Sequence, residues 1–374
     1  MIIKNGKVFI EGSFFNNYDV RIEDGIIKEI GVGLDGSEVV DANGQFVFAG
    51  FIDTHIHGAA MVACGEGEEA MRKICAFLPQ YGVTSIMPTP IVRDDIERSI
   101  KAVRGIRAAK GAKGTDILGI YLYTGFQNRS DPYYPLHVAP TKEMTLEMAD
   151  GDLSDIKMIL VAPDLPGALD WIKWVSGEGV IPTIGFTEAT SEQIYQAVEN
   201  GATLTDHFYN GFPVMDHHES GSTVGCLTAP DLYFQMNCDC IHVAPPFIRL
   251  AILAKGIDKI VPVSDSSIYI GAAEGEYTFE DGKKVFVKDG TVRDINGKLV
   301  TGAHTYDENV RTMYANGFTL EEIGTMFTEN AANAIRIKDR GKIEIGRRGD
   351  IVILDENLFV KKTYILGEEV YSAE

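Results

Sequence analysis

The sequence predicts an α/β protein, a (β/α)₈ TIM-type barrel joined to a small β-sandwich that is built from both ends of the chain. Three observations support this prediction. Apolar strand-like runs alternate with amphipathic helix-like stretches through the middle of the chain, both ends carry short strands separated by turns, and polar residues close several of the apolar runs. Alternating strands and helices indicate a parallel sheet, and eight candidate strands suggest closure into a barrel.

Residues 49–337 are assigned to the barrel. Four of the stretches between its strands have helical periodicity and end at glycine, a usual residue after a helix. Near residues 276–300 the pattern changes to Asp-Gly and Asn-Gly turns, which predict a β-hairpin insertion. The eight candidate strands read FVFAGFIDTHIH, TSIMPTP, ILGIYLY, KMILVAP, IPTIGF, TLTDHFYN, LYFQMN and KIVPVSD.

Residues 1–48 and 338–374 form the predicted β-sandwich. Both segments consist of short apolar runs between turn residues, and Asp24-Gly25 is a strong hairpin signal. Neither segment has enough strands for a core of its own, so we expect the two ends of the chain to fold together.

Composition limits the class of protein. The chain has 374 residues, is 45% hydrophobic and carries a net charge of −20, which argues against nucleic acid or an anionic membrane surface as a partner. The five cysteines are an odd number and thinly spread, as expected of reduced thiols, and the Cys238-x-Cys240 spacing is weak evidence for a metal. No signal-peptide pattern is found, and no apolar run reaches the ~18 residues of a membrane span. We expect a cytoplasmic protein.

Four polar residues at strand ends suggest metal and proton-transfer chemistry. His55 and His57 lie two residues apart on the first strand and therefore point to the same side. His207 lies in the sixth strand and Asp265 ends the eighth, and active sites of barrels lie at these ends. Such a set suits a divalent transition metal, which lowers the pKa of a water to ~7 while a nearby carboxylate moves protons. A single histidine is more often a hydrogen-bonded core residue than a ligand, but the combination is stronger evidence.

Several motifs resemble the amidohydrolase superfamily, and within it the N-acetylglucosamine-6-phosphate deacetylases, over almost the whole chain. The motifs are GFIDTHIHG, HFYNGF, CIHVAP, VPVSDSS and the hairpin GEYTFEDGKKVFVKDGTV. The resemblance implies metal-dependent removal of an acetyl group from an amino-sugar phosphate. It also implies a homodimer, because the family's phosphate-binding Arg comes from the neighbouring subunit. The implied roles are metal ligation by His55, His57 and His207, acid–base catalysis by Asp265, and substrate contact by Asn210, Gly211, His242 and, at the position of that Arg, His218.

Three positions depart from the family pattern. Tyr123 stands where the family has a metal-binding Glu, Phe186 where it has a metal-binding His, and His218 where it has the phosphate-binding Arg. The first two changes damage the family's main metal site, and the third weakens phosphate recognition. The remaining ligands can still hold one divalent metal, with zinc expected and iron or another transition metal as alternatives. Glu188 is a candidate replacement ligand, although a solvated loop acid is the preferred interpretation.

The leading hypothesis is therefore a metal-dependent amidohydrolase that cleaves the N-acetyl amide of an amino-sugar-like substrate, with little activity on N-acetylglucosamine 6-phosphate. A second hypothesis is a diverged paralogue that binds a sugar-like ligand without hydrolysing it. A third keeps the barrel and the metal but acts on another amide or catalyses a different reaction. Retention of all four strand-end residues favours catalysis, because a pure binding protein has no evident use for them. The two lost ligands favour the other hypotheses.

Overall fold

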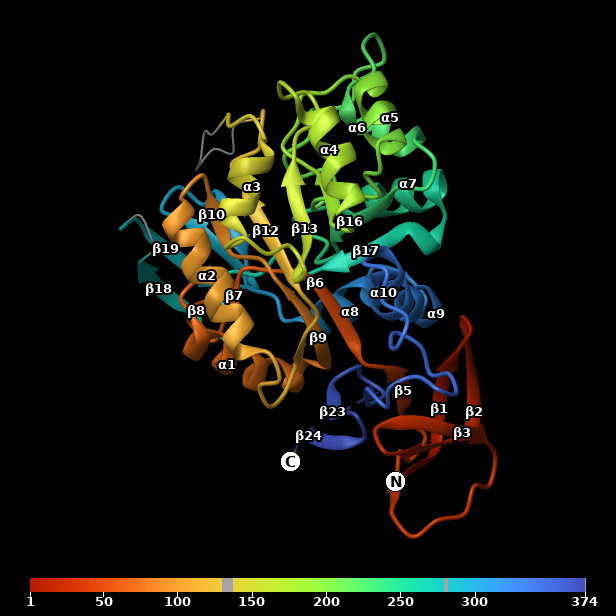
Figure 1. Cartoon of the computed structure of the whole chain (residues 1–374). Helices are drawn as coiled ribbons and strands as arrows, with labels where there is room; N and C mark the ends of the chain where they lie inside the picture. The colour runs from red at the N-terminus through yellow and green to blue at the C-terminus, as the bar shows by residue number, and fades with distance from the viewer. Residues whose placement is uncertain (130–136, 279–281, 374) are drawn as a thin grey trace.

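The computed structural model describes residues 1–129, 137–278 and 282–373, and Figure 1 shows the course of the chain. Residues 279–281 of the predicted insertion and residue 374 of the predicted terminal unit lie outside the described residues. Among the helices that are described, none is both long and apolar enough to cross a membrane.

A curled parallel sheet lies at the centre of the molecule. Its strands are β6 (Phe51–Ile56), β9 (Val83–Pro88), β10 (Ile91–Arg93), β11 (Asp116–Ile117), β12 (Ile120–Thr124), β13 (Ile156–Val161), β14 (Ile181–Ile184), β15 (Leu204–Thr205), β16 (Tyr233–Asn237) and β17 (Ile260–Val263). They pair in the orders β10-β12-β13-β14-β15-β16-β17 and β11-β9-β6. Ile56 at the end of β6 forms a parallel bridge with Ser266 beyond β17, so the first and last strands approach each other. The predicted parallel sheet is confirmed, and its complete closure stays a prediction.

Helices cover the outer face of this sheet (Figure 1). Two of them, for example, begin with side-chain caps: Asp95 accepts a hydrogen bond from the Arg98 backbone, and Thr190 and Gln193 form a capping box. Apolar side chains between helices and strands make the main core. The helices are α1 (Glu68–Phe77), α2 (Ile96–Ala109), α3 (Lys142–Met148), α4 (Ala168–Gly177), α5 (Ser191–Glu199), α6 (Ser222–Thr228), α7 (Pro245–Lys255), α8 (Tyr306–Ala315), α9 (Leu320–Gly324) and α10 (Ala331–Ala334), with short helical turns at Leu78–Tyr81, Ile257–Lys259 and Thr325–Asn330.

Both ends of the chain contribute to a single mixed sheet. Its strands are β1 (Ile2–Ile10), β2 (Ser13–Glu23), β3 (Ile26–Gly31), β4 (Val39–Asp41), β5 (Phe46–Ala49), β22 (Ile351–Leu354), β23 (Val360–Ile365) and β24 (Glu368–Ser372). The order is β24-β23-β22-β5-β1-β2-β3, with β4 beside β1. The two ends are joined where β22 pairs antiparallel with β5, and Figure 1 shows both termini on this sheet. Its buried face has an apolar core of its own. A two-layered sandwich stays a prediction.

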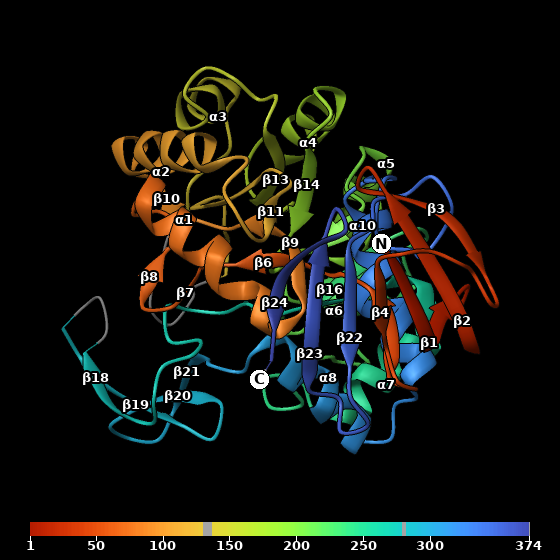
Figure 2. The ribbon, with the colours of Figure 1, turned by 90° about the horizontal axis from the view of Figure 1, so that it is seen from below.

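A small antiparallel sheet lies between the last parallel strand and α8. It consists of β18 (Gly275–Thr278), β19 (Lys284–Lys288), β20 (Thr291–Asp294) and β21 (Leu299–Gly302), paired in that order. Figure 2 shows it projecting at one side of the molecule. A short hairpin of β7 (Gly58–Ala59) and β8 (Val62–Ala63) follows β6. Because β21 returns the chain toward the end of β17, its residues reach the rim of the site described below.

Candidate active site

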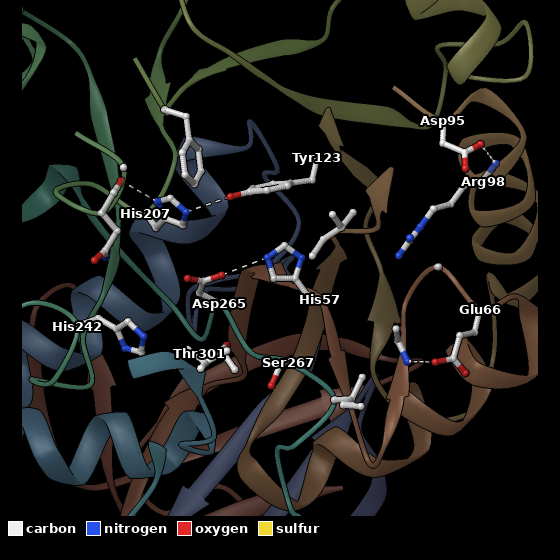
Figure 3. A pocket seen from close by; sticks show the side chains of 18 of the residues that line it. His57, Glu66, Asp95, Arg98, Tyr123, His207, His242, Asp265, Ser267 and Thr301 are labelled. Atoms are coloured by element: carbon white, nitrogen blue, oxygen red, sulfur yellow. Dashed lines mark hydrogen bonds and ion pairs between the residues drawn. The ribbon is translucent and has the colours of Figure 1, made fainter. Parts of the chain in front are cut away.

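The polar residues singled out in the sequence lie at the carboxyl ends of the parallel strands. His55 is in β6 and His57 directly follows it, whereas His207 follows β15 and Asp265 follows β17. Parallel strands bring these ends to one edge of a sheet, so residues far apart in the sequence meet there. Figure 3 shows His57, His207 and Asp265 facing one pocket.

His55, His57 and Asp265 converge on one point. The Nε2 atoms of the two histidines lie 3.1 Å apart, and Asp265 Oδ1 lies 3.4 Å from the first and 3.2 Å from the second. The Nδ1 of His57 lies 2.7 Å from the carbonyl oxygen of Thr89, which can only accept, so Nδ1 carries the proton and Nε2 the lone pair. These three residues are a donor set that Zn²⁺ or a similar divalent ion accepts, so they fit such a metal.

The histidines keep Asp265 ionised. Burial raises the pKa of its carboxyl, but the positive charges of His55, His57 and His207 in their protonated forms, and the hydrogen bond that a protonated His57 donates, outweigh burial and hold that pKa well below its ordinary value. Burial in turn lowers the pKa of His57, and the Asp265 carboxylate more than reverses that effect. The backbone of Asp265 has a φ of 47°, and its N–H donates to the His55 carbonyl oxygen at 3.0 Å. Such a left-handed aspartate, fixed by its neighbours, is typical of a functional position.

A second carboxylate, Asp206, lies behind the histidines and was not predicted from the sequence. It is fully buried, and its Oδ1 accepts a hydrogen bond of 2.7 Å from the Tyr121 hydroxyl. Its Oδ1 also lies 3.1 Å from His55 Nδ1, and its Oδ2 lies 3.1 Å from His207 Nε2. Burial raises the pKa of Asp206, but the two histidines and Tyr121 hold it below its ordinary value. The only sequence signal was an acid beside a strand-end histidine, which also describes many loop residues.

Tyr123 and Phe186 fill the space beside His207. The Tyr123 hydroxyl lies 3.1 Å from His207 Nε2, and the Phe186 ring packs edge-on against the imidazole with centroids 5.1 Å apart. The Nδ1 of His207 lies 3.1 Å from the carbonyl oxygen of Asn210 and donates to it, so Nε2 can accept from Tyr123. His207 is not one of the three residues whose ligand atoms cluster. Its role as a metal ligand stays a prediction.

A pocket of about 890 Å³ opens in front of the cluster. This size suits a small-molecule ligand. His242 lines the pocket, and its Nδ1 is paired with the Asp239 carboxylate at 2.5 Å. Burial lowers the pKa of His242, but Asp239 more than reverses this and raises it above the ordinary value. Val300 and Thr301 of β21 complete one rim, so the insertion reaches the pocket.

Asn210 and Gly211 also line the pocket. The Asn210 amide donates to Asn237 Oδ1 at 3.1 Å, and Asn237 in turn donates to Asp265 Oδ2 at 3.2 Å. Asn237 therefore links Asn210, a predicted substrate contact, to Asp265, the predicted acid–base residue. Asn237 itself was not predicted from the sequence. Gly211 has a φ of +72°, and a Cβ there would lie 3.0 Å from the Phe186 ring. The position therefore requires glycine for both conformation and space.

Two other residues of interest in the sequence lie away from the cluster. His218 is exposed beside Asp216 and His217 and is not among the residues that line the pocket, so its contact with substrate stays a prediction. The Glu188 carboxylate pairs with Arg129 and is half exposed, as expected of a solvated loop acid. All five cysteines, which lie within the described ranges, are free thiols.

A curled parallel sheet with an imidazole–carboxylate cluster at its carboxyl edge is an arrangement suited to metal-assisted hydrolysis. The chain belongs to the amidohydrolase family, whose sequence model matches residues 46–370.

Full-length relatives fit the same class. The chain is 29% identical to an N-acetylglucosamine-6-phosphate deacetylase of Lysinibacillus sphaericus, over 98% of this chain and 97% of that protein. It is 26% identical to an N-acetylgalactosamine-6-phosphate deacetylase of Escherichia coli O157:H7, over 98% of both chains. The crystal structure of N-acetylglucosamine-6-phosphate deacetylase from Pasteurella multocida superposes with a TM-score of 0.89 at 26% identity, covering 100% of this chain and 99% of that one.

Proposed function

We propose that the protein is a metal-dependent amidohydrolase that removes the acetyl group from an N-acetylated amino-sugar derivative. The observation that carries this proposal is the convergence of His55, His57 and Asp265 on one point at the edge of the pocket. The deacetylases named among its full-length relatives support the choice of an amide bond and an amino sugar.

The proposed centre holds one divalent metal ion, with zinc expected. When bound, such an ion supplies a Lewis acid and lowers the pKa of a water molecule. His55 and His57 would hold it through Nε2, and Asp265 would face it through Oδ1. We propose a single ion because the phenyl ring of Phe186 has no donor atom and the phenol of Tyr123 would be an unusual ligand.

Asp265 is the proposed proton carrier. It takes a proton from the water that attacks the amide carbonyl, and delivers it to the amine nitrogen as the C–N bond breaks, so the products are acetate and an amine. Asn237 holds Oδ2 of the carboxylate at 3.2 Å, which fixes its orientation toward the pocket.

Asn210, Gly211 and His242 are the proposed substrate contacts. All three line the same pocket as Asp265, and Asp239 keeps a proton on His242 Nδ1. A protonated His242 would favour an anionic or strongly hydrogen-bonding group on the sugar. His218 would contact substrate only through a movement of its exposed loop or in a neighbouring subunit of the proposed homodimer.

The test is release of acetate from N-acetylglucosamine and from the 6-phosphates of N-acetylglucosamine and N-acetylgalactosamine, by the zinc-loaded and the metal-stripped protein. We expect metal-dependent release from at least one compound, and slow release from N-acetylglucosamine 6-phosphate. Asp265→Asn should lower turnover by roughly 10²–10⁴-fold. No release from any compound, with binding detected by calorimetry, would favour the alternative of a sugar-binding paralogue, which the apolar Phe186 beside His207 supports.

The same proposal includes the closed eight-stranded barrel, the β-sandwich of residues 1–48 and 338–374, and a barrel unit of residues 49–337. The Ile56–Ser266 bridge supports closure, and the β5–β22 pairing supports one terminal unit.

Free thiols support a cytoplasmic location. The homodimer rests on the resemblance to the deacetylases, and sedimentation tests it.

A further inference from the structure

We infer that Asp206, oriented by Tyr121, is a positioning residue that holds His55 in the tautomer and ring orientation needed to bind the metal. This inference rests on the proposed metal site. Asp206 and Tyr121 are fully buried and neither lines the pocket, so they act on a substrate or metal only through another residue.

The His55 ring lies between two carboxylates. Asp206 Oδ1 is 3.1 Å from Nδ1, and Asp265 Oδ1 is 3.4 Å from Nε2. A neutral imidazole carries one proton, and a proton on Nδ1 faces Asp206 and leaves the Nε2 lone pair for the metal. Histidine ligands of metals almost always donate their other N–H to a carboxylate, a carbonyl or water, which fixes the ring and raises its basicity. Thr89 accepts this N–H from His57, and Asp206 is the carboxylate placed to accept it from His55.

Tyr121 fits this role through its hydrogen bond to Asp206. Burying a carboxylate is costly unless partners stabilise its charge. The Tyr121 hydroxyl donates to Asp206 Oδ1 at 2.7 Å and so stabilises the charge of the buried carboxylate. Tyr121 comes from β12 and Asp206 follows β15, so the contact crosses the inside of the curled sheet.

His55 Nδ1 and Asp206 Oδ1 lie within hydrogen-bond distance, 3.1 Å apart, but their geometry is not that of a hydrogen bond. Within the part of the chain that the structure describes, His55 Nδ1 and Asp206 Oδ2 have no partner of hydrogen-bond geometry, although both are buried. Unpaired buried polar atoms are costly. A small rotation of the His55 ring would let Nδ1 donate to Asp206 Oδ1 while Nε2 keeps its lone pair for a metal. We therefore expect the Asp206 contact and metal affinity to change together.

The experiment measures the dissociation constant for Zn²⁺ by chelator competition, and the visible spectrum of the Co²⁺-substituted protein, in the parent, Asp206→Asn and Tyr121→Phe. Loss of such an outer partner weakens metal binding by roughly 10–100-fold. We expect this loss, with an altered Co²⁺ spectrum, in Asp206→Asn, and a smaller loss in the same direction in Tyr121→Phe. If Asp206→Asn does not fold, the zinc affinity and the Co²⁺ spectrum of Tyr121→Phe alone test the inference.

Tyr364→Phe is the matched control, because Tyr364 is a buried tyrosine that donates to a carboxylate, Glu369 at 3.0 Å, in the terminal sheet. It should lower the unfolding temperature without changing zinc affinity. Equal zinc affinity in the parent and both site variants would overturn the inference, as would unchanged affinity in a folded Tyr121→Phe alone. A parent that binds no metal would instead overturn the proposed function.

Discussion

His55 Nε2 and His57 Nε2 lie 3.1 Å apart, close to the ~3.3 Å that separates two ligands of a tetrahedral zinc ion. The lone pair of His57 is directed into this gap, because its Nδ1 donates to Thr89. Asp265 closes the third side with a negative charge. The arrangement therefore offers a divalent cation three donors beside the pocket that His57 and Asp265 line.

Restoring the two family ligands tests the meaning of the departures. Tyr123→Glu with Phe186→His would place a carboxylate and an imidazole beside His207, where the hydroxyl of Tyr123 now lies 3.1 Å from Nε2. We expect more bound metal per chain and faster acetate release from N-acetylglucosamine 6-phosphate than in the parent. The control is the double variant Tyr123→Gln with Phe186→Leu. It changes the same two positions but adds neither a carboxylate nor an imidazole. If the parent already releases acetate rapidly, the two residues do not limit activity.

Removing the support of Asp265 should slow turnover. Asn237→Ala deletes the donor that holds Oδ2 at 3.2 Å. A hydrogen bond to a charged group contributes about 1.5–3 kcal/mol, so kcat should fall by roughly 10–100-fold with a smaller change in KM. Asn330→Ala removes a buried amide that bonds Ile257 and Ile260 instead, and should affect stability but not kcat. Similar kinetics in both variants would argue against a role for Asn237.

The His242–Asp239 pair should depend on pH. Because Asp239 raises the pKa of His242 above its ordinary 6.5, the stability from His242 is fully present below pH 6.5 and is lost as the pH rises through the raised value. The pKa of Asp239 is lowered from 3.8, so its contribution is present above pH 3.8 and is lost as the pH falls through the lowered value. We expect NMR titration to give His242 a pKa above 6.5 in the parent and a lower one in Asp239→Asn. An unchanged His242 titration would disprove the pairing.

Gly211 should not tolerate a side chain. Gly211→Ala adds left-handed strain of roughly 1–2 kcal/mol and a contact with the Phe186 ring, where the new Cβ would lie 3.0 Å away. Gly12→Ala has a similar φ of +77° with nothing within 4 Å, so it isolates the backbone strain. The unfolding free energy should fall further in Gly211→Ala than in Gly12→Ala. Equal losses would show that Phe186 moves aside at no cost.

Local sequence patterns predicted those features of the site that depend on the position of a residue within its own strand. The two-residue spacing of His55 and His57 fixes a common face whatever their partners are, and the strand-end position of Asp265 places it at the same edge. The pairing of Tyr121 with Asp206 joins residues that are 85 positions apart. Such a contact depends on how the sheet curls, which no local pattern records. Asp206 therefore resembled a loop acid in the sequence.

The terminal strands illustrate the same limit. Similar turn-rich composition at both ends predicted that they fold together, and β5 pairs with β22. Composition does not specify which strands are neighbours, because several orders bury the same apolar faces. The single continuous sheet was therefore not predicted. Asp281-Gly282 and Asn296-Gly297 marked turns of the insertion, but one hairpin was expected where four strands pair.

Elemental analysis of the protein, purified without chelator and again after dialysis against Zn²⁺, tests the metal centre most directly. The geometry of His55, His57 and Asp265 predicts one zinc ion per chain at neutral pH, and its loss in His57→Ala with the fold retained. Absence of bound metal in the parent at every pH at which histidine is neutral would contradict the proposed site and the hydrolysis assigned to it.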